Sequence, residues 1–202
     1  MNLETHWNNI FEKTEDKKLG WWEDDTSQTL KFLKDLDIYS NKNIFLAGAG
    51  TSILVDEIIK MSSNLILNDI SDVALEKLKN RLKNFKNIEF FQQDLSKNFK
   101  TKDIDIWIDR AVLHFLLDEK DIENYFENLK INLKKGGYVL FAQFRKGGAT
   151  TCASLDIKQY DLEEFSKRLK DDFELIKNEE YDYINPFGNK KEYIYALYKK
   201  IK

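Results

Sequence analysis

Short apolar runs alternate with helical patterns along most of the chain, and this alternation is the feature that most constrains the fold. The apolar runs are rich in β-branched and aromatic residues, as buried strands are. They are "NIFLA" (43–47), "NLILN" (64–68), "NIEFFQQ" (87–93), "DIDIWID" (103–109) and "GYVLFAQF" (137–144). Strands that alternate with helices predict parallel pairing with right-handed crossovers, and therefore a doubly wound α/β sheet.

The helical patterns lie between these runs. Residues 51–60 carry apolar side chains at helical spacing, and a second pattern begins at Ser71, whose hydroxyl suits an N-cap. A third pattern covers residues 121–133 and stops at "KKGG" (134–137), where cations are followed by glycines. We therefore predict one helix in each of these three connections.

The two ends of the chain differ from the middle. The runs at 171–184 and 190–200 are rich in strand-forming residues and are joined by "NPFGN", a turn signal, so they predict an antiparallel hairpin on one edge of the sheet. Residues 1–40 predict two amphipathic helices, the second starting near Asp25 or Thr26. The expected architecture is a single domain over residues 1–202. Its Rossmann-like core (41–202) is a mostly parallel seven-stranded sheet, and its N-terminal helical cap is residues 1–40.

Composition limits the class of protein. A chain of 202 residues suits one domain, and 42% hydrophobic with 33% charged residues is typical of a soluble globular protein. The net charge of −3 argues against a nucleic-acid partner, and the sequence has no apolar run long enough to span a bilayer and no signal peptide. A single cysteine, Cys152, fits a reducing compartment, and His6, His114 and Cys152 lack metal-ligand spacing. We expect a cytoplasmic protein without membrane, nucleic-acid or metal partners, and leave its oligomeric state open.

A glycine turn follows the first apolar run, in "IFLAGAGTSILVD" (44–56). In an open α/β sheet such a turn lies at the carboxyl ends of the strands, where ligands bind, and Gly48 and Gly50 let backbone approach a ligand closely. A P-loop requires a lysine, and none lies between Ile44 and Glu57. Ile53 replaces the third glycine of a dinucleotide fingerprint, which disfavours NAD or FAD.

Acidic residues follow the next two strands. Asp69 ends the second strand, nineteen positions after Gly50, where a carboxylate can accept hydrogen bonds from both ribose hydroxyls. Its alternative role is to cap the following helix, which Ser71 can do instead. Asp94 follows the third strand, where it can meet the exocyclic amine of adenine or serve as an ordinary loop aspartate. Together with the glycine turn, these acids favour a nucleoside without a pyrophosphate.

With these residues in place, the sequence resembles the class I S-adenosylmethionine-dependent methyltransferases from about Trp7 to Tyr198. Within that superfamily it looks like a bacterial branch of small methyltransferases with an "HDRAVFHFL"-like block, here "IDRAVLHFL" (108–116). The segment 146–169, "KGGATTCASLDIKQYDLEEFSKRL", is similar to the branch's "DGP-x-x-CSGL-x-x-x-RY" element, and "NPFG" (185–188) is similar to its "TPWG" turn.

The resemblance implies S-adenosylmethionine as cofactor and S-adenosylhomocysteine as product. The family's glycine-rich motif falls on Ala47 to Thr51, with Ala47 where many relatives carry an acidic or valine-type residue. At 155–156 this chain has Leu-Asp where the branch has Leu-Pro. The cofactor-binding residues implied in this way are Ala47, Gly48, Ala49, Gly50, Asp69, Ile70, Asp94, Leu95 and Asp109.

The end of the fourth strand supplies the candidate catalytic residues, Asp109, Arg110 and His114. Asp109 can hold the amino group of the donor's methionine part, orient an acceptor, or cap the following helix. Arg110 can bind an anionic acceptor or pair with an acid of the chain. His114 can be a general base, or a packed histidine among its apolar neighbours.

Aromatic residues are candidates for the acceptor pocket and its lid. We expect Trp21 or Trp22 to exclude water from the reacting groups, and Arg110 and Phe144 to complete the pocket. The alternative for Trp7, Phe11 and these tryptophans is packing of the cap on the sheet. Cys152 has no base beside it in sequence, so we do not expect it to be a nucleophile.

The predicted function is methyl transfer from S-adenosylmethionine to a small-molecule acceptor by in-line displacement. The alternatives are a protein lysine methyltransferase, a non-catalytic S-adenosylmethionine-binding module, and a nicotinamide-dependent oxidoreductase, which Ile53 and the terminal hairpin disfavour. A closed aromatic pocket would favour a small acceptor, whereas an open acidic cleft would favour lysine.

Overall fold

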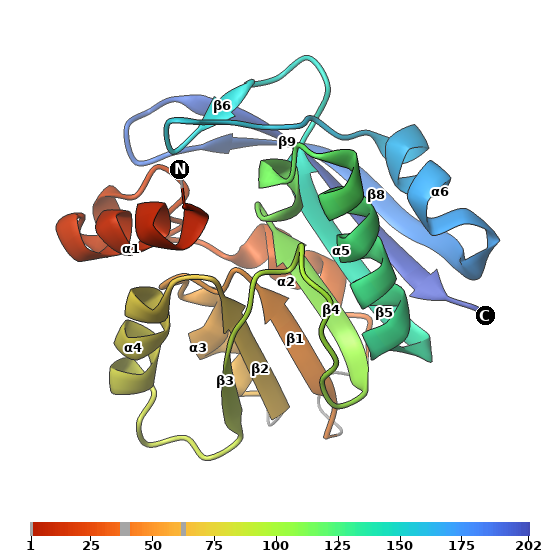
Figure 1. Cartoon of the computed structure of the whole chain (residues 1–202), viewed down its shortest axis with the longest axis horizontal. Helices are drawn as coiled ribbons and strands as arrows, with labels where there is room; N and C mark the ends of the chain where they lie inside the picture. The colour runs from red at the N-terminus through yellow and green to blue at the C-terminus, as the bar shows by residue number, and fades with distance from the viewer. Residues whose placement is uncertain (1, 37–40, 62–63) are drawn as a thin grey trace.

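The computed structural model describes residues 2–36, 41–61 and 64–202, and these residues form a seven-stranded sheet with helices on both faces (Figure 1). The order of its strands across the sheet is β3-β2-β1-β4-β5-β9-β8. The strands are β1 (Asn43–Ala47), β2 (Asn64–Asp69), β3 (Ile88–Gln92), β4 (Ile104–Arg110), β5 (Leu133–Phe144), β8 (Phe173–Ile184) and β9 (Lys190–Lys200). The predicted Rossmann-like α/β fold is confirmed.

The first five strands are parallel, and the C-terminal pair is antiparallel. β9 pairs with β5 and β8 forms the edge, so the predicted hairpin is present. The strand order reverses between β1 and β4, where Ala47 lies opposite Asp109. This is the switch point at which open α/β sheets bind their ligands.

Apolar side chains cover both faces of the sheet. On one face pack α2 (Ser27–Leu33), α3 (Leu54–Ile59) and α4 (Asp72–Arg81). On the other pack α5 (Glu119–Asn132) and α6 (Leu162–Leu169), around a fully buried Trp107 whose ring stacks on Phe45 at 4.2 Å between centroids. About twenty apolar side chains are buried on each face of the sheet, and this burial holds a layer of helices against each face.

The helix boundaries differ slightly from those predicted. The first helix spans Leu54–Ile59 rather than 51–60, because Gly48 and Gly50 have positive φ and the turn continues to Ile53. The third starts two residues earlier, at Glu119, because the side chain of Asp118 accepts the backbone N–H of Lys120. Its end was predicted well, but β5 begins at once, at Leu133, so "KKGG" lies in an irregular strand.

The N-terminal segment divides into two parts. Phe32 and Leu33 of α2 belong to the main core, whereas α1 (Leu3–Lys13) stands off the sheet and lies beside α4 at the carboxyl ends of the strands (Figure 1). A 3-10 turn, η1 (Asp16–Lys18), follows α1. Residues 1 and 37–40 of the predicted cap lie outside the described residues. We use "cap" below for residues 2–26.

Some elements were not predicted. A short 3-10 turn, η2 (Leu113–Phe115), follows β4, and another, η3 (Lys170–Asp172), follows α6. A small hairpin, β6 (Thr151–Cys152) and β7 (Leu155–Asp156), turns through two residues with positive φ, Ala153 and Ser154. This hairpin lies close to α1, because His6 Nε2 is 3.1 Å from the carbonyl oxygen of Ala153.

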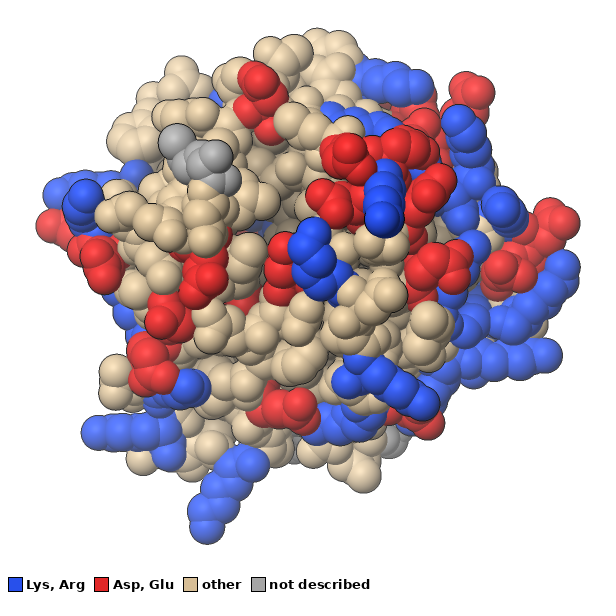
Figure 2. All heavy atoms as spheres, in the orientation of Figure 1, with Lys and Arg blue, Asp and Glu red and all other residues tan. Residues whose placement is uncertain are grey.

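The surface carries both signs of charge. On the face shown in Figure 2, Lys and Arg side chains are interspersed with Asp and Glu around a largely uncharged central region. In the described part of the chain, no helix is long and apolar enough to cross a membrane.

Candidate active site

The glycine turn is fastened to the strand beside it. Gly48 has φ +56° and Gly50 has φ +52°, a left-handed conformation that other residues rarely adopt. The N–H of Ala49 donates to the carbonyl of Asn68 at 2.7 Å, and that of Gly50 donates to Asp69 Oδ2 at 2.8 Å. A Cβ on Gly48 would also overlap the side chain of Val112, so the turn and the loop after β4 are packed together.

Asp69 is the last residue of β2. Its Oδ1 accepts the N–H of Ser71 at 2.9 Å, and Ser71 itself caps α4 by accepting the N–H of Ala74. Asp69 is therefore not the helix cap. Burial raises the pKa of Asp69 to about 6, although the backbone hydrogen bonds from Ser71 and Gly50 oppose that rise. The carboxylate keeps acceptor capacity for a ligand, because its two oxygens offer about four lone-pair sites and its backbone donors are Gly50, Ser71 and Ile70.

Asn68 is a site residue that the sequence interpretation missed. Its Nδ2 donates to the carbonyls of Phe91 and Gln93 at 3.0 and 2.9 Å, so it ties the end of β2 to the end of β3. Asp94 follows, with its Oδ1 bound to the N–H of Ser96. The only signal in the sequence was the position of Asn68 next to Asp69.

These strand ends line one cavity of about 830 Å³, including its open mouth. From here on we call it the main cavity. Most of the predicted cofactor residues contribute to it: Gly48, Gly50, Asp69, Ile70, Asp94 and Leu95. A second hollow lies on the other side of the glycine turn, and there Ala47 and Ala49 join Trp22, Glu23 and Arg110. Arg110 and Trp21 line both spaces.

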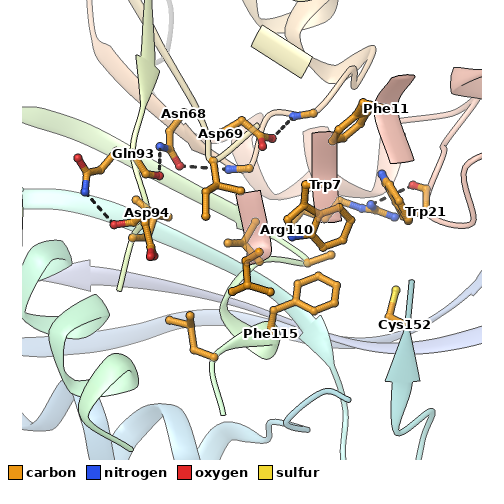
Figure 3. Close-up of a pocket in the computed structure, with 18 residues that line it drawn as sticks. Trp7, Phe11, Trp21, Asn68, Asp69, Gln93, Asp94, Arg110, Phe115 and Cys152 are labelled. Carbon is orange, nitrogen blue, oxygen red and sulfur yellow. Dashed lines mark hydrogen bonds between the residues drawn. The ribbon is translucent and has the colours of Figure 1, made fainter. Parts of the chain in front are cut away.

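Aromatic rings of the cap close the other side of the main cavity (Figure 3). The ring of Trp7 on α1 meets those of Phe115 and Trp21 edge-on, with centroids 5.0 and 5.5 Å apart. The ring of Phe11 packs against Trp21 and lies over Gly50. The main cavity therefore has a polar half at the strand ends and an aromatic half under the cap, which Cys152 of β6 also lines.

Polar contacts hold the cap in this position. Ser71 Oγ and Asn8 Oδ1 are 2.6 Å apart, which joins α1 to the start of α4. Lys77 Nζ lies 3.2 Å from Asp16 Oδ1. Together with the contact of His6 to Ala153, these bonds fasten α1 both to α4 and to the β6–β7 hairpin.

The structure contradicts a direct role for Asp109. Its side chain is fully buried and does not line either hollow. Oδ1 accepts from Val112 N and Gln143 Nε2, and Oδ2 accepts from Leu113 N and the Tyr125 hydroxyl, at 2.5 to 3.2 Å. Burial raises its pKa to about 6 against these hydrogen bonds. Asp109 therefore caps the turn after β4, as one of its alternative roles required, and leaves no lone pair for a ligand.

His114 is also buried away from the main cavity. Its Nδ1 lies 2.9 Å from Gln143 Oε1, and because Gln143 Nε2 donates to Asp109, the proton belongs on Nδ1. Burial lowers the pKa of His114 to about 3, with the charge of Arg110 adding to that effect. The prediction that His114 is a base is wrong for this arrangement, because the ring is neutral and enclosed.

Two predicted lid or pocket residues are also placed differently. Phe144 is buried under Tyr193, with ring centroids 4.7 Å apart, and does not line the main cavity, so its predicted pocket role is wrong. Trp22 lines the second hollow and donates its Nε1–H to Asp24, whereas Trp21 lines both spaces. Of the two tryptophans, Trp21 has the position expected of a lid residue.

Arg110 is the cation at this site. Its Nη2 lies 2.8 Å from Glu23 Oε1, and its Nη1 donates to the carbonyl of Trp21 at 3.3 Å (Figure 3). Its guanidinium lies against the rings of Tyr183 and Tyr193, each with its centre 5.3 Å from Cζ. Arg110 therefore lines both hollows, and Glu23 is its partner acid; its role in an acceptor pocket stays a prediction.

The described residues fit a nucleoside thioether or sulfonium. Two carboxylates, Asp69 and Asp94, stand at successive strand ends, and the left-handed turn at Gly48 and Gly50 leaves the backbone open to the main cavity. Among the described residues, no group of three or more His, Cys, Asp or Glu side chains is placed to hold a metal ion.

The chain belongs to the methyltransferase-domain family, which matches residues 38–200. The fold is that of S-adenosylmethionine-dependent methyltransferases. It superposes with a TM-score of 0.76 on one from Anabaena variabilis, at 16% identity over 98% of this chain and 93% of that one. It superposes at 0.73 on the N-methyltransferase NodS from Bradyrhizobium japonicum in complex with S-adenosyl-L-homocysteine, at 14% identity over 98% of this chain and all of that one. The predicted methyltransferase class is confirmed, and its fold is shared by a protein that binds S-adenosyl-L-homocysteine, the product of the predicted cofactor.

The sequence is also similar to malonyl-[acyl-carrier protein] O-methyltransferase 2 of Ilyobacter polytropus. The two are 27% identical over 138 residues, which is 67% of this chain and 48% of that protein. The match thus spans about half of the length of that relative.

Proposed function

We propose that this chain transfers a methyl group from S-adenosylmethionine to a small-molecule acceptor by in-line displacement. The observation that carries the proposal is the continuity of the main cavity, which joins Asp69 and Asp94 to the aromatic half under the cap. A donor held at the strand ends would present its methyl group toward the aromatic rings. A cavity closed by Trp7 and Trp21 supports a small acceptor better than a lysine of a folded protein.

The proposed cofactor residues are those that line the polar half. Asp69 would accept hydrogen bonds from the ribose, Asp94 would face the adenine, and Ile70 and Leu95 would pack on the base. When bound, the sulfonium supplies an electrophilic methyl group, so the chain itself has to position the acceptor and exclude water. The rings of Trp7, Phe11 and Trp21 serve the second task.

The buried network behind the site sets its shape. Asp109 holds the N–H groups of Val112 and Leu113, and Val112 in turn packs against Gly48. Asp109 and His114 are thus proposed as positioning residues for the loop that separates donor from acceptor. In the aromatic half, Cys152 stays protonated because burial raises its pKa, which leaves Arg110 as the charged group there.

The relatives differ in the atom they methylate, since one is named as an O-methyltransferase and another as an N-methyltransferase. For this chain we propose a small anionic acceptor, because the titratable side chains on the acceptor side are Arg110 and a neutral thiol. Such an acceptor needs no general base. We further propose that the protein works in the cytoplasm as a single domain over residues 1–202, without a nucleic-acid partner.

The test is an acceptor screen with methyl-labelled S-adenosylmethionine. The panel would hold small carboxylates, thiols and amines, together with a lysine-containing peptide and a blank. The expected result is labelled product with a small acceptor, and much less of it when the Asp69→Asn variant replaces the enzyme at a low donor concentration. Labelling of the peptide alone would point to a protein lysine methyltransferase. Tight donor binding without any labelled product would point to a binding module.

A further inference from the structure

The guanidinium of Arg110 is held in place by more than its counterion. Its Cζ lies 5.3 Å from the ring centres of Tyr183 on β8 and Tyr193 on β9. Aromatic faces attract a cation, so both rings help to hold the guanidinium in its present position. If the ion pair with Glu23 were broken, we therefore expect the guanidinium of Arg110 to stay where it is, between the main cavity and the second hollow, both of which it lines.

The donors of Arg110 are incompletely used. Nη1 makes a long hydrogen bond to the carbonyl of Trp21, at 3.3 Å. Nη2 is 2.8 Å from Glu23 Oε1, but neither Nη2 nor the buried Nε has a well-aligned hydrogen-bond partner among the described residues. The side chain of Tyr195 is a further neighbour of the guanidinium. A guanidinium has five N–H groups and pairs best with a carboxylate that approaches side by side. A ligand carboxylate can satisfy Arg110 better than Glu23 does.

Glu23 is the counterion of Arg110, and it can be replaced at little cost in free energy. It lies in the irregular segment between η1 and α2, and Arg110 is its side-chain partner among the described residues. Its side chain is nearly buried, and burial raises its pKa against the opposing charge of Arg110. A buried ion pair contributes little net stability, because desolvation offsets the attraction. Replacing one carboxylate by another at Arg110 is therefore close to balanced in free energy.

We propose that Arg110 is a carboxylate-binding residue of the active site, and that Glu23 occupies it as an internal substitute until a ligand carboxylate takes its place. This inference rests on the function proposed above and specifies a chemical group of one ligand. The group has two possible sources, the methionine part of the donor and the acceptor. Both would reach Arg110 from a space that it lines.

The exchange would also act on the cap. Trp21 is attached to Arg110 through its carbonyl and forms part of the aromatic wall, and Glu23 lies two residues further along the chain. A ligand that displaces Glu23 frees this segment to rearrange. Binding of the ligand carboxylate to Arg110 would therefore change the contacts that hold the cap.

The donor arm of the test compares two nucleosides by calorimetry. S-adenosylhomocysteine carries an amino-acid part with its carboxylate, whereas 5′-methylthioadenosine is an adenosine thioether without that amino-acid part. If the donor is the source, Arg110→Gln weakens S-adenosylhomocysteine by about 10- to 100-fold and leaves methylthioadenosine unchanged. Glu23→Gln should instead strengthen the binding of S-adenosylhomocysteine, because it removes the carboxylate that competes for Arg110.

The acceptor arm titrates malonate, a simple carboxylate probe, into protein saturated with S-adenosylhomocysteine. If the acceptor is the source, Arg110→Gln abolishes malonate binding and Glu23→Gln tightens it, while the ratio between the two nucleosides does not change. Glu15→Gln is the matched control, since it removes an exposed ion pair with Lys18 within the cap, outside both hollows. It should alter neither the nucleoside ratio nor the malonate affinity.

Opposite effects of the two substitutions in either arm support the exchange. Equal losses from Arg110→Gln and Glu23→Gln, or no change in both arms, would overturn it and leave the pair as a structural contact. Arg110→Lys, which keeps the charge, covers the case in which Arg110→Gln does not fold. If the wild type binds neither nucleoside, the proposed function fails as well. If the wild type binds the nucleosides normally and neither substitution changes any affinity, only the proposed exchange is contradicted, and the proposed function stands.

Discussion

Asp69 and Gly50 are joined directly, because Oδ2 of the buried carboxylate accepts the backbone N–H of the glycine turn at 2.8 Å. Its other oxygen accepts the N–H of Ser71, at the start of the next helix. One side chain therefore shapes the turn after β1, fixes the entry to α4 and faces the main cavity. We expect changes at Asp69 to affect donor binding more than changes at other capping acids.

The Asp69→Asn variant tests this expectation. The amide can accept only through its oxygen, so it loses the bond from either Gly50 or Ser71 and presents an NH2 group where the second carboxylate oxygen would accept from the ribose. The dissociation constant of S-adenosylhomocysteine should therefore rise by about 10- to 100-fold. Asp118→Asn is the control, because Asp118 caps α5 without lining the main cavity. An equal dissociation constant in wild type and Asp69→Asn would contradict the assigned role.

Donor affinity should depend on pH through the same carboxylate. The pKa of Asp69 is raised to about 6 from a usual value of 3.8, so the group takes up a proton as the pH falls below 6 and loses acceptor capacity. Calorimetry at pH 7.5 and pH 5 should show weaker binding at pH 5, and this difference should shrink in Asp69→Asn. Proton uptake by the folded state also means that Asp69 contributes more stability to the free protein as the pH falls from 6 to 4.

His114 should affect acid stability rather than catalysis. Its pKa is lowered to about 3 from 6.5. Between pH 3 and pH 6.5 the histidine is therefore protonated in the unfolded chain but neutral in the folded protein. Its contribution is present above pH 6.5 and is lost as the pH falls, by at most about 1.4 kcal/mol per pH unit. His114→Asn keeps a donor for Gln143 and removes the titration.

Urea denaturation of wild type and His114→Asn at pH 7.5 and pH 5 measures this difference. The variant should lose less stability than the wild type on acidification. Its methyl transfer at pH 7.5 should stay within a few-fold of the wild type. A loss of more than about a hundredfold with the fold intact would restore His114 as a catalytic base.

Trp21 and Trp22 are neighbours in the chain, but of the two only Trp21 lines the main cavity. Trp21→Ala removes a ring from the aromatic half of the main cavity, whereas Trp22→Ala changes the second hollow. We expect Trp21→Ala to lower kcat/KM by about tenfold or more, because water enters beside the reacting groups. Trp22→Ala should have a smaller effect on the rate. A larger loss from Trp22→Ala would move the lid role to that residue.

The local signals of the sequence predicted residues that line the polar half of the main cavity. Gly48, Gly50, Asp69 and Asp94 lie at or just after strand ends, and parallel strands bring their carboxyl ends to one edge of the sheet, so their positions in sequence translate into positions in space. The same reasoning predicted the C-terminal hairpin from its turn residues.

Other parts of the site depend on contacts between distant residues. The role of Asp109 was decided by Tyr125 and Gln143, which lie 16 and 34 positions away, and no local pattern shows that they converge on it. The link between Arg110 and Glu23 crosses from the end of β4 to the N-terminal segment. Side-chain direction and cap placement come from packing, which spacing alone does not encode.

The most direct test of the central claim is a thermal-shift and calorimetric titration of the wild type with S-adenosylhomocysteine and with NAD. A ligand that binds the folded state raises its melting temperature by mass action. The account predicts one site for S-adenosylhomocysteine, a higher melting temperature on its addition, and no response to NAD. Stabilisation by NAD alone, with no binding of S-adenosylhomocysteine, would contradict the account.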